Sequence, residues 1–228
     1  MTKKGDGSRI TIYTYANIYI RERAAMSATV LDQIPFEVTL DALIGRLKLQ
    51  NRPSTHEDLA QLLQFANSKG HPKVMYREAL IAEKGEDFII IDGIKLTSSG
   101  LREKLGQVDR IYPFIVTCGV ELGDWAASFT GTFTKYCAGA ICELAMFSAS
   151  NYFNDHFKEH HPVGKVATLR PGSLRDWTIR DQEQIFTLLG DPSTIGVTLT
   201  ERCMMSPIKS VSGIRYATDE EVEDVHHH

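Results

Sequence analysis

The sequence predicts an α+β fold with a mainly antiparallel sheet and flanking helices. Short apolar runs are separated by turn residues, and helical segments fall between them without a regular strand–helix–strand alternation. The chain has 228 residues, of which 43% are hydrophobic and 24% charged, so it can bury a sizeable core. We therefore expect one folded domain, since no internal repeat or low-complexity linker divides the chain.

The first half of the chain combines hairpin and helix patterns. Strands are expected where Tyr, Ile, Val and Thr gather, at residues 10–20, 73–82 and 87–96. Helices are expected at residues 21–33, 39–48 and 99–105. A further helix follows Pro53, because Ser54 and Glu57 have the spacing of a capping box and leucines then recur at helical intervals until Gly70. The strands at 73–82 and 87–96 are expected to pair as a hairpin across Gly85.

The second half of the chain contains the longest helical pattern. Strands are expected at residues 110–118, 165–169, 197–203 and 210–216, and helices at residues 119–129, 133–160 and 180–189. Small residues recur along 133–160, which indicates close approach of another element, expected to be the sheet.

Composition excludes several classes of protein. The formal net charge is -4 and no basic run occurs, which argues against a nucleic-acid partner. No apolar stretch approaches the roughly 20 residues that cross a bilayer, and the polar start resembles no signal peptide, so a cytoplasmic protein without a membrane partner is expected. Four cysteines do not form a disulfide framework in a chain of this size. The terminal His226, His227 and His228 resemble a purification-tag remnant.

Three local patterns invite a chemical interpretation that the sequence does not favour. His156, Glu159 and His160 match the H-x-x-E-H spacing of inverted zinc peptidases, but basic residues at the polar end of a helix also complement its dipole. Apolar surroundings favour buried structural thiols at Cys118, Cys137 and Cys142. Gly119 follows a strand without a full glycine-rich fingerprint, so we expect a strand-to-helix corner there and no dinucleotide site. No metal site is expected either.

The C-terminal third holds the best candidate for a ligand site. One candidate loop, between a strand and a helix, consists of Arg170, Pro171, Gly172 and Ser173. Two interpretations of this loop are possible. It is either a turn with a glycine at positive φ, or a binding loop in which an arginine and backbone groups contact a carboxylate or phosphate. A second polar cluster consists of Lys209, Ser210, Ser212 and Gly213. No residue is assigned a catalytic role.

The sequence resembles the activation domain of cobalamin (vitamin B12)-dependent methionine synthase and its stand-alone relatives. Three ordered segments carry the resemblance: Ile111 to Gly119, Arg170 through Asp176-Trp177 to Leu189, and Ile195 through Met204-Met205-Ser206-Pro207 to Gly213. The agreement extends over about residues 40–215. It implies a single C-shaped domain, with residues 40–217 forming the activation-domain fold, 1–39 an N-terminal extension and 218–228 a tail.

The resemblance also implies a role in methionine biosynthesis. Proteins of this family bind S-adenosylmethionine and support the reductive activation of a corrinoid cofactor. Because 228 residues leave no room for the other modules of a methionine synthase, the cobalamin is expected to come from a partner, either a corrinoid-binding protein or methionine synthase. The electron would come from a flavodoxin-like or iron–sulfur donor. The cofactor-binding residues implied are those of the two clusters at 170–173 and 209–213.

One departure from the family pattern leaves a second interpretation open. The family loop reads Arg-x-x-x-Gly-Tyr, whereas Arg170 stands two residues before Gly172 and Ser173 occupies the place of the tyrosine. The alternative is therefore a non-catalytic docking partner of a corrinoid protein that does not bind S-adenosylmethionine.

Overall fold

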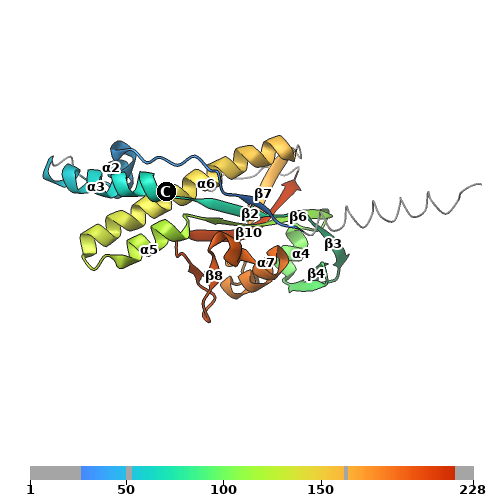
Figure 1. Cartoon of the computed structure of the whole chain (residues 1–228). Helices are drawn as coiled ribbons and strands as arrows, with labels where there is room; N and C mark the ends of the chain where they lie inside the picture. The colour runs from blue at the N-terminus through green and yellow to red at the C-terminus, as the bar shows by residue number, and fades with distance from the viewer. Residues whose placement is uncertain (1–26, 50–52, 162–163, 219–228) are drawn as a thin grey trace, which may run out of the picture.

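The computed structural model describes residues 27–49, 53–161 and 164–218. The predicted strand at 10–20, the first six residues of the predicted helix at 21–33 and nearly all of the tail at 218–228 lie outside these residues. Figure 1 shows an elongated molecule with a sheet at its centre and a group of helices that extends beyond one end of the sheet.

Within the described ranges, eight strands form one antiparallel sheet. They are β1 (Thr29–Leu31), β2 (Lys73–Tyr76), β3 (Ala79–Lys84), β4 (Phe88–Ile91), β5 (Ile94–Thr97), β6 (Arg110–Thr117), β7 (Lys165–Leu169) and β10 (Ser210–Thr218). The central strand β6 pairs with β10 on one side, and β7 continues the sheet beyond β10. On its other side β6 pairs with both β2 and β3, from which β1 and the β4–β5 hairpin continue. A separate hairpin joins β8 (Thr198–Leu199) and β9 (Met205–Ser206).

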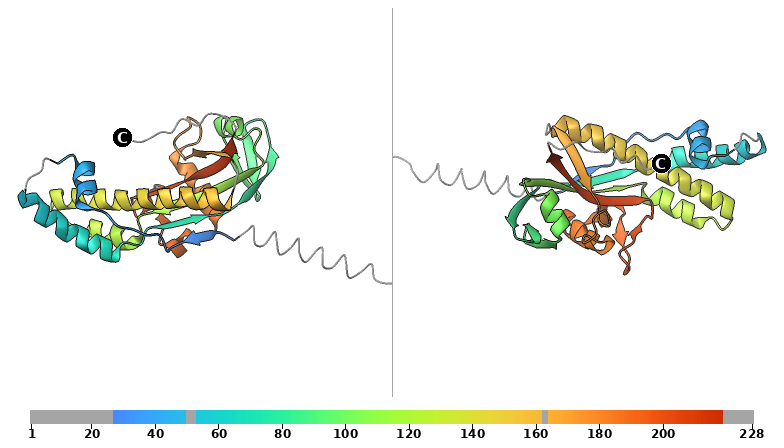
Figure 2. Two further views of the ribbon diagram at one scale, coloured as in Figure 1. Left: turned by 90° about the horizontal axis from the view of Figure 1, so that it is seen from above. Right: turned by 180° about the vertical axis from the view of Figure 1, so that it is seen from behind.

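Helices cover both faces of this sheet and build the extended end. They are α2 (Leu40–Leu47), α3 (Pro53–Lys69), α4 (Ser99–Lys104), α5 (Val120–Ser128), α6 (Thr132–His160) and α7 (Gln182–Leu189), with short 3₁₀ turns η1 (Ile179–Asp181) and η2 (Pro192–Ile195). The group of helices beyond the sheet, here called the helical end, consists of α2, α3, α5 and the first half of α6. The two views in Figure 2 show α6 running from this helical end across one face of the sheet. Helices α4 and α7 lie on the opposite face, beside the β3–β5 region and β8 (Figure 1).

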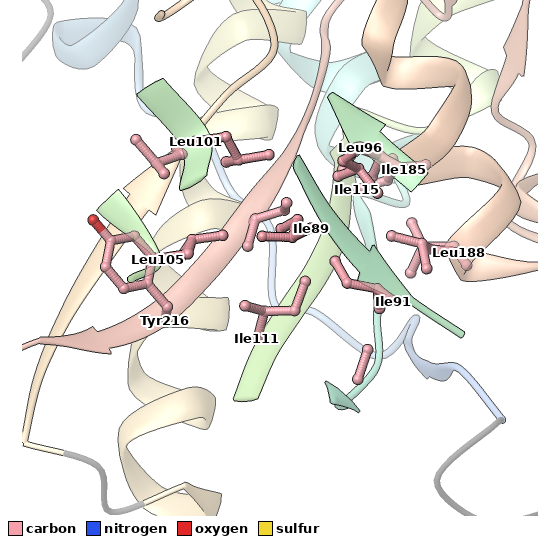
Figure 3. Packing of buried hydrophobic residues seen from close by; sticks show 14 of the residues in the cluster. Ile89, Ile91, Leu96, Leu101, Leu105, Ile111, Ile115, Ile185, Leu188 and Tyr216 are labelled. Carbon is pink, nitrogen blue, oxygen red and sulfur yellow. The ribbon is translucent and has the colours of Figure 1, made fainter. Parts of the chain in front are cut away.

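Alternation along β6 explains why both faces are covered. Tyr112 and Phe114 point to one face, where they pack with Phe153 and Phe157 of α6. The intervening apolar positions point to the other face, as expected for a strand of period two. Figure 3 shows this second cluster, in which Ile89, Leu96, Ile111 and Ile115 of the sheet lie with Ile185 and Leu188 of α7.

A third cluster stabilises the helical end. It contains buried residues from α2, α3, α5 and the first half of α6, including Leu43, Leu59, Leu122 and Ile141. The small residues of α6 are divided between two clusters: Ala140 and Ala145 pack among helices, while Ala149 faces the sheet. The expectation that the sheet is their partner therefore holds for Ala149 but not for Ala140 and Ala145, because α2, α3 and α5 approach this half of α6 instead.

The α+β fold with a mainly antiparallel sheet is confirmed, and most predicted elements occur within two residues of their expected bounds. The hairpin predicted from two strands, 73–82 and 87–96, contains four strands in the structure, β2 to β5. The first segment breaks at Arg77, whose buried side chain forms an ion pair with Asp92. The second breaks at Asp92 and Gly93, whose φ values of 49° and 78° form a tight turn between β4 and β5.

Three further boundaries differ from the prediction. Helix α3 begins at Pro53, so Ser54 lies in its first turn and is not the cap; proline is well suited to the first helical position. The helix predicted at 21–33 is wrong at its end, where β1 pairs with β2. The strand predicted at 197–203 ends after Leu199, because the Thr200 N–H donates to the Met204 carbonyl and turns the chain.

Candidate functional site

The loop that follows β7 is a compact turn held by its own backbone. Gly172 has a φ of 92°, a conformation that residues with a Cβ rarely adopt. Its N–H donates to the Trp177 carbonyl at 2.7 Å, and the Ser173 N–H donates to the Arg170 carbonyl at 2.9 Å. The Ser173 hydroxyl accepts from the Arg170 N–H at 3.2 Å. The glycine that the sequence predicts at positive φ is therefore confirmed, and Ser173 serves the turn itself.

Two side chains anchor the far end of this loop. Trp177 is fully buried in the cluster on the α7 face. The Asp176 carboxylate accepts from the Ser99 N–H at 2.6 Å and lies 2.8 Å from the Ser98 hydroxyl, at the start of α4. The hydrogen bond from Ser98, with others from backbone N–H groups, lowers the pKa of Asp176. The loop is thus attached to the core and to α4, while Arg170, Gly172 and Ser173 remain exposed.

Arg170 lies beside a second arginine that sequence reasoning missed. Arg215 of β10 is 7% exposed, and its guanidinium lies 3.8 Å from the centre of the Phe153 ring. It donates to the Phe153 carbonyl at 3.4 Å and to the side-chain oxygen of Asn154. Burial, followed by repulsion from Arg170, lowers the pKa of Arg215 to about 10. An arginine between two apolar residues of a strand, Ile214 and Tyr216, was the available signal.

Within the described residues, neither arginine has a carboxylate partner. The ion pairs of the described part of the chain involve other residues. Burial also lowers the pKa of the Arg170 guanidinium, although the residue as a whole is exposed. Two neighbouring cations without a carboxylate create a positive potential that favours an anionic group at this loop.

Ser212 and Gly213 are buried on β10, next to the strand β7 that leads into the loop. A Cβ on Gly213 would lie 2.5 Å from the Leu169 carbonyl oxygen, so this glycine allows β7 and β10 to approach. The Ser212 hydroxyl lies 3.4 Å from Gln182 Oε1, and Gln182 in turn donates to the Cys203 carbonyl. These two predicted site residues therefore serve the packing of β10 against β7 and α7.

Lys209 and Ser210 lie at the start of β10. Ile214 pairs with Leu169, whereas Ser210 pairs with Thr117, so Lys209 stands about 13 Å along the strand from Gly213 at 3.3 Å per residue. Lys209 binds the Glu143 carboxylate of α6 at 3.3 Å. The structure thus divides the predicted ligand residues into two places, with the loop 170–173 beside Ser212 and Gly213 at one of them.

The zinc interpretation of the histidines is not supported. Among the described residues, no group of three His, Cys, Asp or Glu side chains is arranged to hold a metal ion. His156 Nε2 lies 2.9 Å from the Tyr76 hydroxyl, and the His156 and His160 rings stack with centroids 4.0 Å apart. Burial, followed by the nearby histidines, lowers the pKa of His156. His156 packs on the aromatic cluster at the end of α6, and the exposed His160 stacks on His156.

The cysteines and Gly119 take the structural roles that the sequence predicts. Cys118, Cys137 and Cys142 are free and buried. Gly119 has a φ of 90° and joins β6 to α5, and a Cβ there would lie 2.4 Å from the His71 carbonyl oxygen. The strand-to-helix corner is confirmed.

The protein therefore belongs to the α+β class, with an open antiparallel sheet, a long helix on one face and an arginine-bearing loop at the end of β7. Residues 173–223 match a family model described as the activation domain of vitamin B12 dependent methionine synthase. The crystal structure of the MetH reactivation domain bound to AdoHcy matches with a TM-score of 0.60 at 15% identity, over 87% of this chain and 81% of that one. No curated protein matches the chain.

These findings confirm the resemblance to the methionine synthase activation domain. At 15% identity the structural likeness establishes the fold alone. The family model adds a match in sequence, which covers residues 173–223. Across the described ranges, none of the helices is long and apolar enough to cross a membrane.

Proposed function

We propose that this protein binds S-adenosylmethionine at the loop 170–173 and supports the reductive remethylation of a corrinoid cofactor carried by a separate protein. That protein would be a methionine synthase or another corrinoid methyltransferase. The supporting observation is the combined match to the activation-domain family and to the fold of the AdoHcy-bound reactivation domain. S-adenosylhomocysteine is what S-adenosylmethionine becomes when it gives up its methyl group, so the neighbour's ligand is the expected product.

The residues of this chain would bind and orient the methyl donor. Arg170 and Arg215 supply positive charge, which suits the carboxylate of the methionine moiety. Gly172 exposes backbone at the turn, and Trp177 fixes the loop to the core. A corrinoid on the partner, reduced by an electron from a flavodoxin-like or iron–sulfur donor, would accept the methyl group. The positioning of the donor is the part assigned to this protein.

Isothermal titration calorimetry with S-adenosylmethionine and S-adenosylhomocysteine tests the proposal. Arg170→Ala should weaken binding by roughly 10-fold to 150-fold, because a hydrogen bond to a charged group contributes about 1.5–3 kcal/mol. Arg175→Ala is the matched control, since Arg175 is exposed on the same connection between β7 and η1, two residues beyond the loop. Absence of binding by the unaltered protein, or equal weakening in both variants, would refute the role of this loop.

The second candidate is a docking partner of a corrinoid protein that does not bind S-adenosylmethionine. Ser173 favours it, because this residue replaces the family's ligand-contacting tyrosine and its hydroxyl is already used by the Arg170 N–H. Co-purification with a corrinoid protein, together with no heat of binding for either ligand, would select this candidate.

A further inference from the structure

A cationic pocket lies at the junction of the helical end and the start of β10. Its volume is about 250 Å³, and charged side chains from three elements line it: Arg46 of α2, Lys135 and Glu143 of α6, and Lys209 just before β10. Gly139 and Ala140 also contribute to its wall, and a Cβ on Gly139 would have nothing within 4 Å. The absence of a side chain at residue 139 therefore leaves open space next to the charges.

The charges of this pocket do not cancel. Glu143 Oε1 binds Arg46 Nη2 at 2.7 Å, and Glu143 Oε2 binds Lys209 Nζ at 3.3 Å. Although burial opposes it, these two cations lower the pKa of Glu143, so this carboxylate is ionised at neutral pH. Both of its oxygens are occupied by the two cations. Lys135 remains as a third cation, and three positive groups against one carboxylate leave a net charge of +2.

The Lys135 ammonium group is available to bind a ligand. Its side chain lines the pocket, and within the described residues it forms neither a hydrogen bond nor an ion pair. Arg46 uses one N–H on Glu143, and a guanidinium has five. The pocket thus offers unused donors as well as excess positive charge. An anion with several oxygens would use them better than a single carboxylate, since each cation can meet a different oxygen.

One aromatic side chain lines the pocket beside these charges. Tyr136 is 57% exposed and lines the same pocket. A ring that is largely exposed beside a cationic pocket can cover the apolar part of a ligand whose charged end meets Lys135.

We propose that this pocket binds the phosphate group of an aromatic phosphate ester. Lys135, Lys209 and Arg46 would meet the phosphate oxygens, Glu143 would hold two of these cations in place, and Tyr136 would contact the aromatic part. This site is distinct from the loop 170–173, because Lys209 is about 13 Å along β10 from Gly213. It does not depend on the binding of S-adenosylmethionine.

Calorimetry of the full chain with phenyl phosphate tests the site, with sodium chloride at the same ionic strength as the reference. Saturable binding by the unaltered protein is expected, and Lys135→Gln should weaken it at least fivefold. Lys158→Gln is the matched control, because Lys158 is an exposed lysine on the same helix, far from the pocket. Heat that only follows ionic strength, or equal weakening by both substitutions, would overturn the proposal.

A second variant separates binding from folding. Gly139→Ala should raise the thermal midpoint, because alanine is the better helix former, yet it should weaken phenyl phosphate binding because its methyl group enters the open space. Unchanged binding in this more stable variant would argue against the pocket. Inorganic phosphate is the second probe. Weaker binding of inorganic phosphate, with the difference lost in Tyr136→Ala, supports an organic ester, whereas equal affinity of the two probes would refute the ester and leave a free phosphate site.

Discussion

Replacing Gly213 by alanine should destabilise the protein, although alanine suits most strands and helices better than glycine. Gly213 lies on β10 opposite Phe114 of β6, and its neighbour Ile214 pairs with Leu169 of β7. An added Cβ would lie 2.5 Å from the Leu169 carbonyl oxygen and 3.0 Å from the Phe114 ring. The carbonyl is backbone, so the contact is relieved only if the two strands move apart.

The size of the effect follows from this overlap. Carbon and carbonyl oxygen meet at about 3.3 Å in sheets, so the added methyl group would be roughly 0.8 Å too close. Phe114 cannot move aside freely, since it is buried against Phe153. Overpacking of this kind costs about 1–3 kcal/mol. For a domain of this size that corresponds to a loss of roughly 2–12 °C in the thermal midpoint.

Urea unfolding followed by circular dichroism measures the change, with Gly45→Ala as the control. Gly45 lies in α2, and a Cβ there would have nothing within 4 Å, so alanine should gain about 0.5–1 kcal/mol. The two substitutions should therefore move the unfolding midpoint in opposite directions. If Gly213→Ala were as stable as the unaltered protein, the close approach of β7 and β10 would be wrong.

The remaining predictions concern pH. Because hydrogen bonds lower the pKa of Asp176 in the folded protein, it stabilises the fold above the ordinary aspartate value and loses this effect as the pH falls. Asp176→Asn should therefore lower the urea midpoint at pH 7, and the difference should disappear well below about pH 4; a difference that persists there would contradict this explanation. Burial lowers the pKa of His156 next to Tyr76, so protonation should destabilise the protein as the pH falls below about 6.5. His156→Gln should reduce that loss between pH 6.5 and 5, and an identical pH profile would count against it.

Periodicity predicted the long elements of this fold correctly, because their packing repeats along many residues. The helix at 133–160 and the strand at 110–118 are examples. Short elements depend on single residues, which periodicity averages out. The β4–β5 hairpin was read as one strand because Ile89, Ile90 and Ile91 continue the apolar pattern, although Asp92-Gly93 is a favourable sequence for a two-residue turn.

The candidate site was only partly predictable for a different reason. The turn chemistry of Gly172 is local, so the sequence was sufficient for it. Arg215 was missed because its importance depends on Phe153 and Asn154, more than 60 positions away, and on the neighbouring Arg170. Lys209 and Gly213 are close in sequence, which is why the sequence groups them. In an extended strand, however, each residue adds about 3.3 Å, so four residues separate them by about 13 Å.

The continuity of α6 sets a fixed spacing between the two candidate sites. Gly139 of the cationic pocket and Asn154, which holds Arg215, are 15 residues apart on this helix, which corresponds to about 22 Å at 1.5 Å per residue. The helix packs into the helical end through residues such as Ile141 and onto the sheet through Phe153 and Phe157. A change in this spacing would have to break hydrogen bonds inside α6. A partner that engages both places at once would therefore meet two sites at an invariant separation, which favours bivalent recognition.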